Sequence, residues 1–208
     1  MVCFNLIRHG KTQWNLEKRL QGEADIPLAP EGRLQVASWC PALDQVPLEL
    51  ILSSPMVRAR ATAEILGQHL GLPVEISELL REQAFGQWQG QRIDDIRQAS
   101  PGMVEFQESL GWDFCPPGGE PRHGVLARAL AALEAAANQY KDHRILVVTH
   151  NGVLRSLAYH ALGRGFLPGE KRVIRDGHLH RFSWDHGLVL SKLNAVNLNP
   201  GDRRRVSA

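Results

Sequence analysis

Four short runs of apolar and β-branched residues recur along the chain, and helical patterns separate most of them. The runs are VCFNLI (2–7), LELILS (48–53), VEIS (74–77) and RILVVT (144–149). Such nearly continuous apolar character is typical of buried strands that are covered on both faces, as in parallel sheets. The alternation of strand and helix therefore predicts a layered α/β domain with a mainly parallel sheet.

The segments between these runs carry helix signals. Helix starts, apolar periodicity and terminal glycines predict helices at 31–39 after Pro30, at 57–70 before Gly71, at 124–140, and at 153–162 before Gly163. Two late runs, HLHRFSW (178–184) and LVLSKL (188–193), are separated by DHG. This spacing predicts an antiparallel hairpin at an edge of the sheet.

Between residues 81 and 121 the periodic pattern weakens, and glycine, proline and aromatic residues accumulate. We expect this stretch to be a lid-like insertion over the carboxyl ends of the strands. No linker or internal repeat divides the chain, so a single domain over residues 1–208 is predicted. The run Arg203–Arg204–Arg205 lies in a basic tail at about 200–208, and we interpret it as a solvated terminus.

Composition narrows the class of partner. The chain has 24 Lys and Arg against 22 Asp and Glu, which gives no electrostatic case for nucleic acid or a membrane as the main partner. Its three cysteines, Cys3, Cys40 and Cys115, have no metal-ligand spacing and argue against a disulfide framework. With no signal segment and no apolar run near the roughly 20 residues of a membrane span, a cytoplasmic setting is expected.

Two histidines follow two of the predicted strands directly. His9 comes after NLIR, and His150 comes after ILVVT. In open α/β sheets, ligands bind beyond the carboxyl ends of the strands, so two histidines placed there indicate a site. Arg8 adjoins His9, and Arg58 follows the strand that ends near residue 53. Because the planar donors of arginine fit phosphate, the set indicates a phosphate pocket rather than a polar surface turn.

Four segments in this order resemble the histidine phosphatase superfamily, the phosphoglycerate mutase-like proteins. They are RHGKTQWN (8–15), SSPMVRARATAEIL (53–66), LREQAFGQWQG (80–90) and VVTHNGVLRSLA (147–158). The resemblance covers about residues 3–162. It implies a three-layer α/β/α sandwich with the site at the carboxyl edge of the sheet. It also implies a phosphohistidine intermediate, with no metal and no cofactor.

The resemblance also implies a role for each matching residue. His9 corresponds to the nucleophile, Glu82 to the proton donor and His150 to the second histidine of the phosphate pocket. Arg8 and Arg58 correspond to the phosphate-binding arginines, and Asn15 to a further phosphate contact. Gln21, in LQGEADIPLAPEG (20–32), is expected to reach the substrate, whereas Thr12 supports the first turn.

The proposed chemistry needs these residue types in its own right. A histidine attacks phosphorus only as the neutral imidazole, and neighbouring arginines favour that form. Arginines and a second histidine can stabilise the charge of the transferring phosphoryl group, and a carboxyl group can protonate a leaving alkoxide. The chain departs from the family pattern at THNG (149–152) and at Pro121, which replaces a serine in PPGGEP (116–121) and would suit the first position of a helix.

In the superfamily that the chain resembles, the mutases carry a longer insertion between the glutamate and the second histidine. The short stretch from Glu82 to His150 therefore favours transfer of the phosphoryl group to water. We therefore predict a metal-independent phosphatase that acts on a small phosphorylated metabolite. Phosphoglycerate mutase-type transfer and a phosphate-binding regulatory module with little turnover stay open, as does assembly into a homo-oligomer.

Two groups of residues near the predicted lid have alternative roles, so they do not identify the substrate. Trp88, Trp112 and Phe114 pack against an organic group of the substrate or fill a small core of the lid itself. Arg122 and His123 contact a second anionic group or stay solvated at a helix start.

Overall fold

The computed structural model describes residues 1–199, and the basic tail lies outside the described residues. Its strands are β1 (Val2–Arg8), β2 (Leu50–Ser53), β3 (Val74–Ile76), β4 (Arg144–Thr149), β5 (His178–Trp184) and β6 (Leu188–Asn197). Its α-helices are α1 (Gln13–Leu16), α2 (Pro30–Leu43), α3 (Val57–Leu70), α4 (Ile93–Ala99), α5 (Met103–Ser109), α6 (Arg122–Gln139) and α7 (Asn151–Ala161). Short 3₁₀ turns lie at Glu78–Leu80, Gly86–Trp88 and Gly111–Asp113.

The strands form one six-stranded sheet in the order β3-β2-β4-β1-β5-β6. Strands β1 to β4 are parallel, and β5 runs antiparallel to both β1 and β6. The mainly parallel sheet and the antiparallel edge hairpin are therefore confirmed. The second strand of the hairpin is longer than predicted and ends at Asn197.

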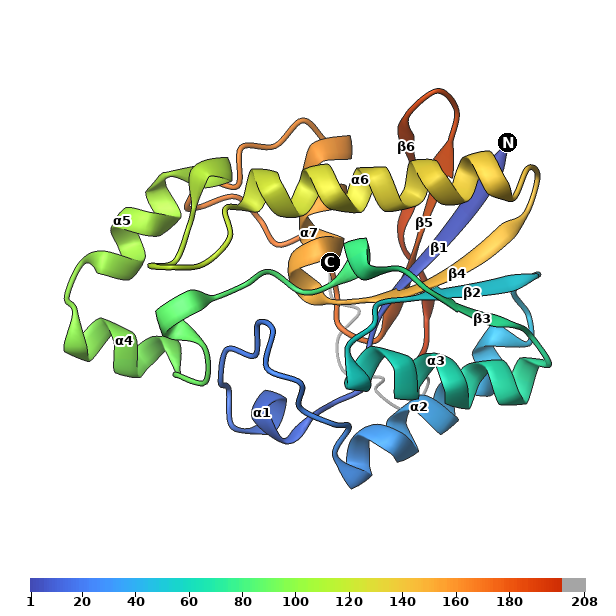
Figure 1. Cartoon of the computed structure of the whole chain (residues 1–208), viewed down its shortest axis with the longest axis horizontal. Helices are drawn as coiled ribbons and strands as arrows, with labels where there is room; N and C mark the ends of the chain where they lie inside the picture. The colour runs from blue at the N-terminus through green and yellow to red at the C-terminus, as the bar shows by residue number, and fades with distance from the viewer. Residues whose placement is uncertain (200–208) are drawn as a thin grey trace, which may run out of the picture.

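Helices cover both faces of the sheet, with α2 and α3 on one side and α6 and α7 on the other (Figure 1). Strand β4 shows why its sequence is apolar throughout. Ile145 and Val147 pack in the core beneath α6 and α7, whereas Leu146 and Val148 pack in the core beneath α2 and α3. Because successive side chains of a strand point to opposite faces, a central strand buried on both sides loses polar alternation. The three-layer α/β/α arrangement is confirmed.

Several element boundaries differ from the predictions. The run VEIS forms the edge strand β3, whose side chains are half-buried or exposed, so the prediction of a buried strand there was wrong. Helix α2 includes Pro30 at its first turn and continues through Pro41 to Leu43, beyond the predicted end at Trp39. Helix α6 begins at Arg122, two residues before the predicted start at Gly124. Pro121 is its N-cap residue and not its first helical residue.

The segment at 81–121 contains the short helices α4 and α5, which Figure 1 shows at the end of the sheet where β1 and β4 finish. The segment has its own small core, in which Trp88, Ile96, Val104 and Phe114 are buried together. Its interpretation as a lid within one domain stays a prediction. Across residues 1–199, the model has no helix that combines the length and hydropathy of a membrane span.

Candidate active site

The register of the sheet brings the two predicted histidines together. Arg8, the last residue of β1, is paired with Thr149, the last residue of β4. His9 and His150 are the next residues of their chains, and their ring centroids lie 5.1 Å apart. Both side chains are buried. The sequence prediction that two strand ends would deliver two histidines to one place is thus matched by the geometry.

Gly10 allows the turn after His9 to pack closely on the layer below. A Cβ atom at Gly10 would lie 2.5 Å from Cγ2 of Val36 and 2.9 Å from the carbonyl oxygen of Gly32, both in α2. The amide of Gly10 donates to Oγ1 of Thr62 in α3 (3.1 Å). No larger residue fits this turn without moving α2, so the glycine fixes where His9 emerges.

One hydrogen bond sets the protonation pattern of His9. Its Nδ1 lies 2.7 Å from the carbonyl oxygen of Gly10. Because a carbonyl oxygen only accepts, Nδ1 carries the proton in the neutral ring and Nε2 carries the free lone pair. Burial holds the pKa of His9 well below its usual value, and the charges of Arg8 and Arg58 lower it further. The ring is therefore a neutral base whose Nε2 is free to attack.

His150 is the N-cap residue of α7, and its Nε2 lies 2.7 Å from Oγ of Ser54. The Ser54 hydroxyl also accepts the amide of Met56 (3.3 Å). Burial lowers the pKa of His150 well below its usual value, and the charges of Arg58, Arg8 and Arg128 lower it further. Within residues 1–199, its Nδ1 is buried without a hydrogen-bond partner. A buried polar atom left unpaired is costly, so it marks a place for a ligand.

Arg58 is fully buried, which is rare for arginine. Its Nη1 donates to the carbonyl of Ala24 (2.8 Å) and its Nη2 to the carbonyl of Gly22 (2.9 Å). These bonds tie the loop that carries Gln21 to the start of α3. Within the described chain, Nε of Arg58 and Nε of Arg8 are buried and unpaired. Both arginines line the pocket beside His9, so each has donors for an anion there.

Asn15 and Thr12 form a capping box at α1. Oδ1 of Asn15 accepts the amide of Thr12 (3.0 Å), and Oγ1 of Thr12 accepts the amide of Asn15 (3.2 Å). Thr12 thus supports the turn, as expected. Because Oδ1 is used in the box, the Asn15 side chain offers its amide nitrogen to the pocket that it lines. Gln21 lines the same pocket, where its buried Oε1 has no partner among residues 1–199.

Glu82 is held by backbone amides at the start of α7. Its Oε1 accepts the amide of Gly152 (3.1 Å) and the amide of Gln83 (3.0 Å). A Cβ atom at Gly152 would lie 2.4 Å from that oxygen. The glycine of THNG therefore makes room for the Glu82 carboxyl group.

Arg128 of α6 braces the backbone that carries Glu82. Its guanidinium donates to the carbonyls of Leu79 (2.8 Å), Arg81 (2.5 Å) and Glu82 (3.1 Å). It also forms a two-point ion pair with Glu120, at 2.8 and 2.9 Å. Since five acceptors share one planar group, the position of Glu82 depends on α6 as well as on α7.

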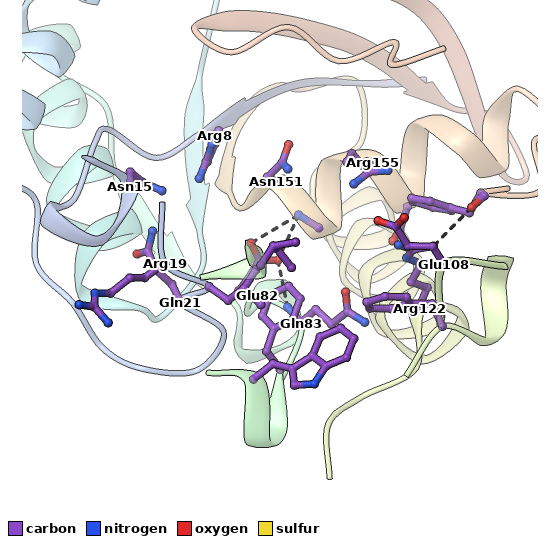
Figure 2. Close-up of a pocket in the computed structure, with 18 of the residues that line it drawn as sticks. Arg8, Asn15, Arg19, Gln21, Glu82, Gln83, Glu108, Arg122, Asn151 and Arg155 are labelled. Atoms are coloured by element: carbon purple, nitrogen blue, oxygen red, sulfur yellow. Dashed lines mark hydrogen bonds between the residues drawn. The ribbon is translucent and has the colours of Figure 1, made fainter. Parts of the chain in front are cut away.

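One pocket, a cavity of about 280 Å³ that Figure 2 shows in close-up, is lined by six of the predicted site residues: Arg8, His9, Asn15, Gln21, Arg58 and Glu82. The ring of His150 lies beside it, with its centroid 5.1 Å from that of His9. Arg8, Asn15, Gln21 and Glu82 lie toward one end, and Glu108, Arg122 and Arg155 lie toward the other (Figure 2). The structure thus brings all the predicted site residues to one region. Their roles in turnover stay predictions.

Asn151 and Arg155 are among the pocket residues that the sequence did not single out. Asn151 and Arg155 follow His150 in α7, and both line the cavity. They are four residues apart, so they lie on the same face of the helix. That spacing was the available signal: a helix that begins directly after a site histidine presents its first and fifth side chains near the same pocket.

The residues near the predicted lid whose roles were undecided lie in different environments. Arg122 is buried and lines the pocket, whereas His123 is exposed and lies 3.2 Å from a carboxylate oxygen of Asp113. Trp88 and Phe114 fill the small core of the segment, in T-shaped contact, and also line the pocket. Trp112 does not line the pocket and packs edge-on against Phe166.

No group of three His, Cys, Asp or Glu side chains suited to a metal ion occurs in residues 1–199. The three cysteines are free. The positive charge of the pocket comes from arginines instead.

Comparison with known proteins gives the family. A profile described as the histidine phosphatase superfamily (branch 1) matches residues 4–196. Glucosyl-3-phosphoglycerate phosphatase of Mycolicibacterium vanbaalenii is 33% identical over 166 residues, which cover 76% of this chain and 73% of that protein. Probable phosphoglycerate mutase GpmB of Escherichia coli is 30% identical over 191 residues, which cover 92% of this chain and 89% of that protein.

Among solved structures, Bacillus stearothermophilus YhfR superposes with a TM-score of 0.83 at 30% identity, and the match covers 94% of this chain and 96% of that one. The sequence match over nearly the whole chain and the shared fold agree with the four motifs and the pocket that they form. The chain belongs to the histidine phosphatase superfamily, branch 1.

Proposed function

We propose that the protein is a phosphatase that hydrolyses a small phosphomonoester through a phosphohistidine on His9. The observation that carries this proposal is the free Nε2 of a buried, neutral His9, which lies in a pocket that arginines and a glutamate line. A pure binding site needs neither a free nucleophile nor a carboxylate seated beside it. Both are preorganised here, which favours turnover over binding alone.

In the first step, Nε2 of His9 attacks phosphorus and the bond to the leaving oxygen breaks. Arg8, Arg58 and the neutral His150 stabilise the charge on the phosphoryl oxygens. When the Ser54 hydroxyl donates to Nε2 of His150, Nδ1 carries the proton and donates to a phosphoryl oxygen, the partner that it lacks in the free protein. Glu82, in its protonated form, gives a proton to the leaving alkoxide. In the second step, the Glu82 carboxylate takes a proton from water, which attacks the phosphohistidine and releases phosphate and the free imidazole.

A mutase-type transfer is the second candidate, and the similarity to probable phosphoglycerate mutase GpmB supports it. The similarity to glucosyl-3-phosphoglycerate phosphatase supports hydrolysis of a phosphorylated metabolite. The third candidate is a phosphate-binding regulatory module. Tight binding of a phosphorylated ligand without turnover would support it.

The test is release of inorganic phosphate from a panel of phosphomonoesters, alongside isomerisation of 3-phosphoglycerate. We expect phosphate release that survives exhaustive chelation, and an acid-labile phosphoryl group on His9 when turnover is stopped by denaturation. His9→Ala should abolish both. Near wild-type turnover in His9→Ala, isomerisation without release, or a strict need for added Mg²⁺ or Zn²⁺ would each contradict the proposal.

A further inference from the structure

The end of the pocket away from His9 contains two arginines that share one aromatic ring. The guanidinium carbon of Arg122 lies 4.5 Å from the ring centroid of Phe166, and that of Arg155 lies 5.0 Å from the same centroid. Arg122 also lies 4.0 Å from the ring centroid of Phe114. Aromatic faces attract cations and orient them, so the Phe166 ring helps to position both guanidinium groups in its vicinity.

Neither arginine forms an ion pair with a carboxylate in the described part of the chain. Across residues 1–199, the ion pairs of the structure include neither Arg122 nor Arg155. Glu108 is the acidic side chain at this end of the pocket, and it forms an ion pair with neither of them. Burial, together with the charge of Arg155, lowers the pKa of Arg122 to about 10. Two neighbouring positive charges that have no ion-pair partner are stabilised when an anion binds beside them.

Both guanidinium groups keep donors for such an anion. Only Nη1 of Arg122 is engaged within the described chain, by the carbonyls of Gly111 (3.0 Å) and Phe166 (3.4 Å). Nε of Arg155 is buried and unpaired across the same residues. Arg122 is only 9% exposed, so its position is fixed by packing before a ligand binds.

The charge of the whole pocket leads to the same inference. Five arginines line it, Arg8, Arg19, Arg58, Arg122 and Arg155, against two glutamates, Glu82 and Glu108. A phosphate dianion at His9 is served by Arg8 and Arg58. The pair at the far end is left without an anion, in a cavity continuous with the phosphate site.

We propose that Arg122 and Arg155 form a second anion subsite, and that the protein prefers small phosphomonoesters carrying a further carboxylate or phosphate group. The inference rests on the proposed function and names its substrate class. The phosphate to be transferred binds at His9, the second anion binds between the two guanidinium groups, and the short organic part passes the aromatic side chains between them. Arg155 is thus a specificity-determining residue.

The test compares substrates matched in all but the second anion. 3-Phosphoglycerate has a carboxylate where glycerol 3-phosphate has a hydroxymethyl group, and propane-1,3-diol bisphosphate adds a phosphate to the monophosphate. In at least one pair, we expect kcat/KM of the wild type to be at least about 10-fold higher for the compound that carries the second anionic group. The reason is that a hydrogen bond to a charged group is worth about 1.5–3 kcal/mol. The pair with the larger ratio identifies the second group.

Arg155→Gln should collapse the preferred ratio toward one, with glycerol 3-phosphate as the internal reference. Arg155→Met, which keeps the apolar stem, is the second variant if the first does not fold. Arg164→Gln is the matched control, because Arg164 also stands 5.6 Å from the Tyr159 ring, as Arg155 does, but does not line the pocket. Its ratio should equal that of the wild type.

Active enzyme with equal kcat/KM within both pairs, or a preference that Arg155→Gln leaves intact, overturns the subsite alone. If no substrate is turned over, the proposed function fails, and calorimetric titration of the protein with 3-phosphoglycerate and glycerol 3-phosphate still decides the subsite. Tighter binding of 3-phosphoglycerate that depends on Arg155 supports it, and equal affinities overturn it.

Discussion

Glu82 is seated by two backbone amides, and this arrangement permits a clean test of its role. Glutamine has nearly the same shape, and its Oε1 can still accept from Gly152 and Gln83. We expect Glu82→Gln to lower kcat about 10²–10⁴-fold for an alkyl phosphate, whose leaving group needs a proton. For an activated aryl phosphate the loss should be much smaller, and KM should move less than kcat for both.

The structure also identifies which carboxylate to suspect if this prediction fails. Of the other acids near the segment, Glu105 pairs with Arg97, Asp113 with His123, and Glu120 with Arg128. Glu108 lines the pocket. Equal losses for alkyl and aryl substrates in Glu82→Gln would therefore move the search to Glu108.

Gly152 is predicted to act only through Glu82. Adding a Cβ there places it 2.4 Å from Oε1 of Glu82, so the carboxylate has to move. We expect Gly152→Ala to lower kcat for alkyl phosphates by about 10–100-fold, in the same substrate-dependent way as Glu82→Gln. Alanine favours a helix over glycine by about 1 kcal/mol, so stability should not fall greatly.

The matched control is Gly124→Ala in α6, where the nearest atoms would lie 3.6 Å from the new Cβ. Activity should be unchanged in that variant, as measured by steady-state kinetics on the same two substrates. Loss of stability without a difference between alkyl and aryl substrates in Gly152→Ala would show that the glycine serves packing instead.

At the level of elements, α6 contributes to the site through a brace. Arg128 binds three carbonyls of the 79–82 stretch and both oxygens of Glu120. Arg128→Lys keeps the charge but cannot reach these acceptors with one ammonium group. We expect it to lower kcat about 10-fold or more for alkyl phosphates and less for aryl phosphates, while the inhibition constant of inorganic phosphate changes little.

A second measurement separates positioning from general damage. The thermal midpoint and the kinetics are measured for Arg128→Lys, for Glu82→Gln and for the double variant. If Arg128 acts through Glu82, adding Arg128→Lys to Glu82→Gln should cost little further kcat. Full additivity of the two losses would assign Arg128 to stability alone.

The elements differ in how much of them the sequence could predict, for physical reasons. Central strands such as β4 are almost entirely apolar because both faces are buried, and this pattern can be recognised in the sequence. Strand β3 also contains β-branched residues but lies at the edge, which only the sheet order determines. Helices α4 and α5 have seven residues each, too few for a clear apolar period.

The site divides in the same way. His9 and His150 could be placed because the carboxyl ends of parallel strands meet at one edge. The contact of Glu82 with Gly152 joins residues 70 apart, and the pairing of Arg122 with Arg155 depends on how α6 and α7 pack. Such contacts arise from tertiary structure, so the sequence could suggest Arg122 for a second anion but could not separate it from His123.

At the scale of the whole molecule, the fold buries histidines that are neutral. His180 of β5 is fully buried, and its Nδ1 accepts the amide of Asn194 (3.1 Å), while its Nε2 has no partner within residues 1–199. Burial, with a contribution from His178, lowers the pKa of His180 to about 4. The pKa values of buried His9 and His150 are lowered as well. The folded protein therefore resists protonation that the unfolded chain accepts.

The sign of the effect on stability follows from this difference. An unfolded histidine has a pKa of about 6.5, so between about pH 6.5 and 4 the unfolded chain binds more protons at His180 than the folded protein does. The free energy of unfolding should thus fall as the pH falls through this window, by about 3 kcal/mol from His180 alone. Below about pH 4 both states are protonated, and this contribution stops changing.

We expect His180→Asn to remove this part of the pH dependence, because the Oδ1 of asparagine replaces Nδ1 as the acceptor for Asn194 and does not titrate. Urea unfolding at pH 7, 5.5 and 4.5 measures it: the variant should lose less stability on acidification than the wild type does. His186→Asn, at an exposed histidine, is the control and should follow the wild type. Parallel pH profiles for His180→Asn and the wild type would mean that His180 takes up its proton over the same pH range in the folded protein as in the unfolded chain. The acid sensitivity of the fold would then have to come from other groups, such as the histidines of the pocket.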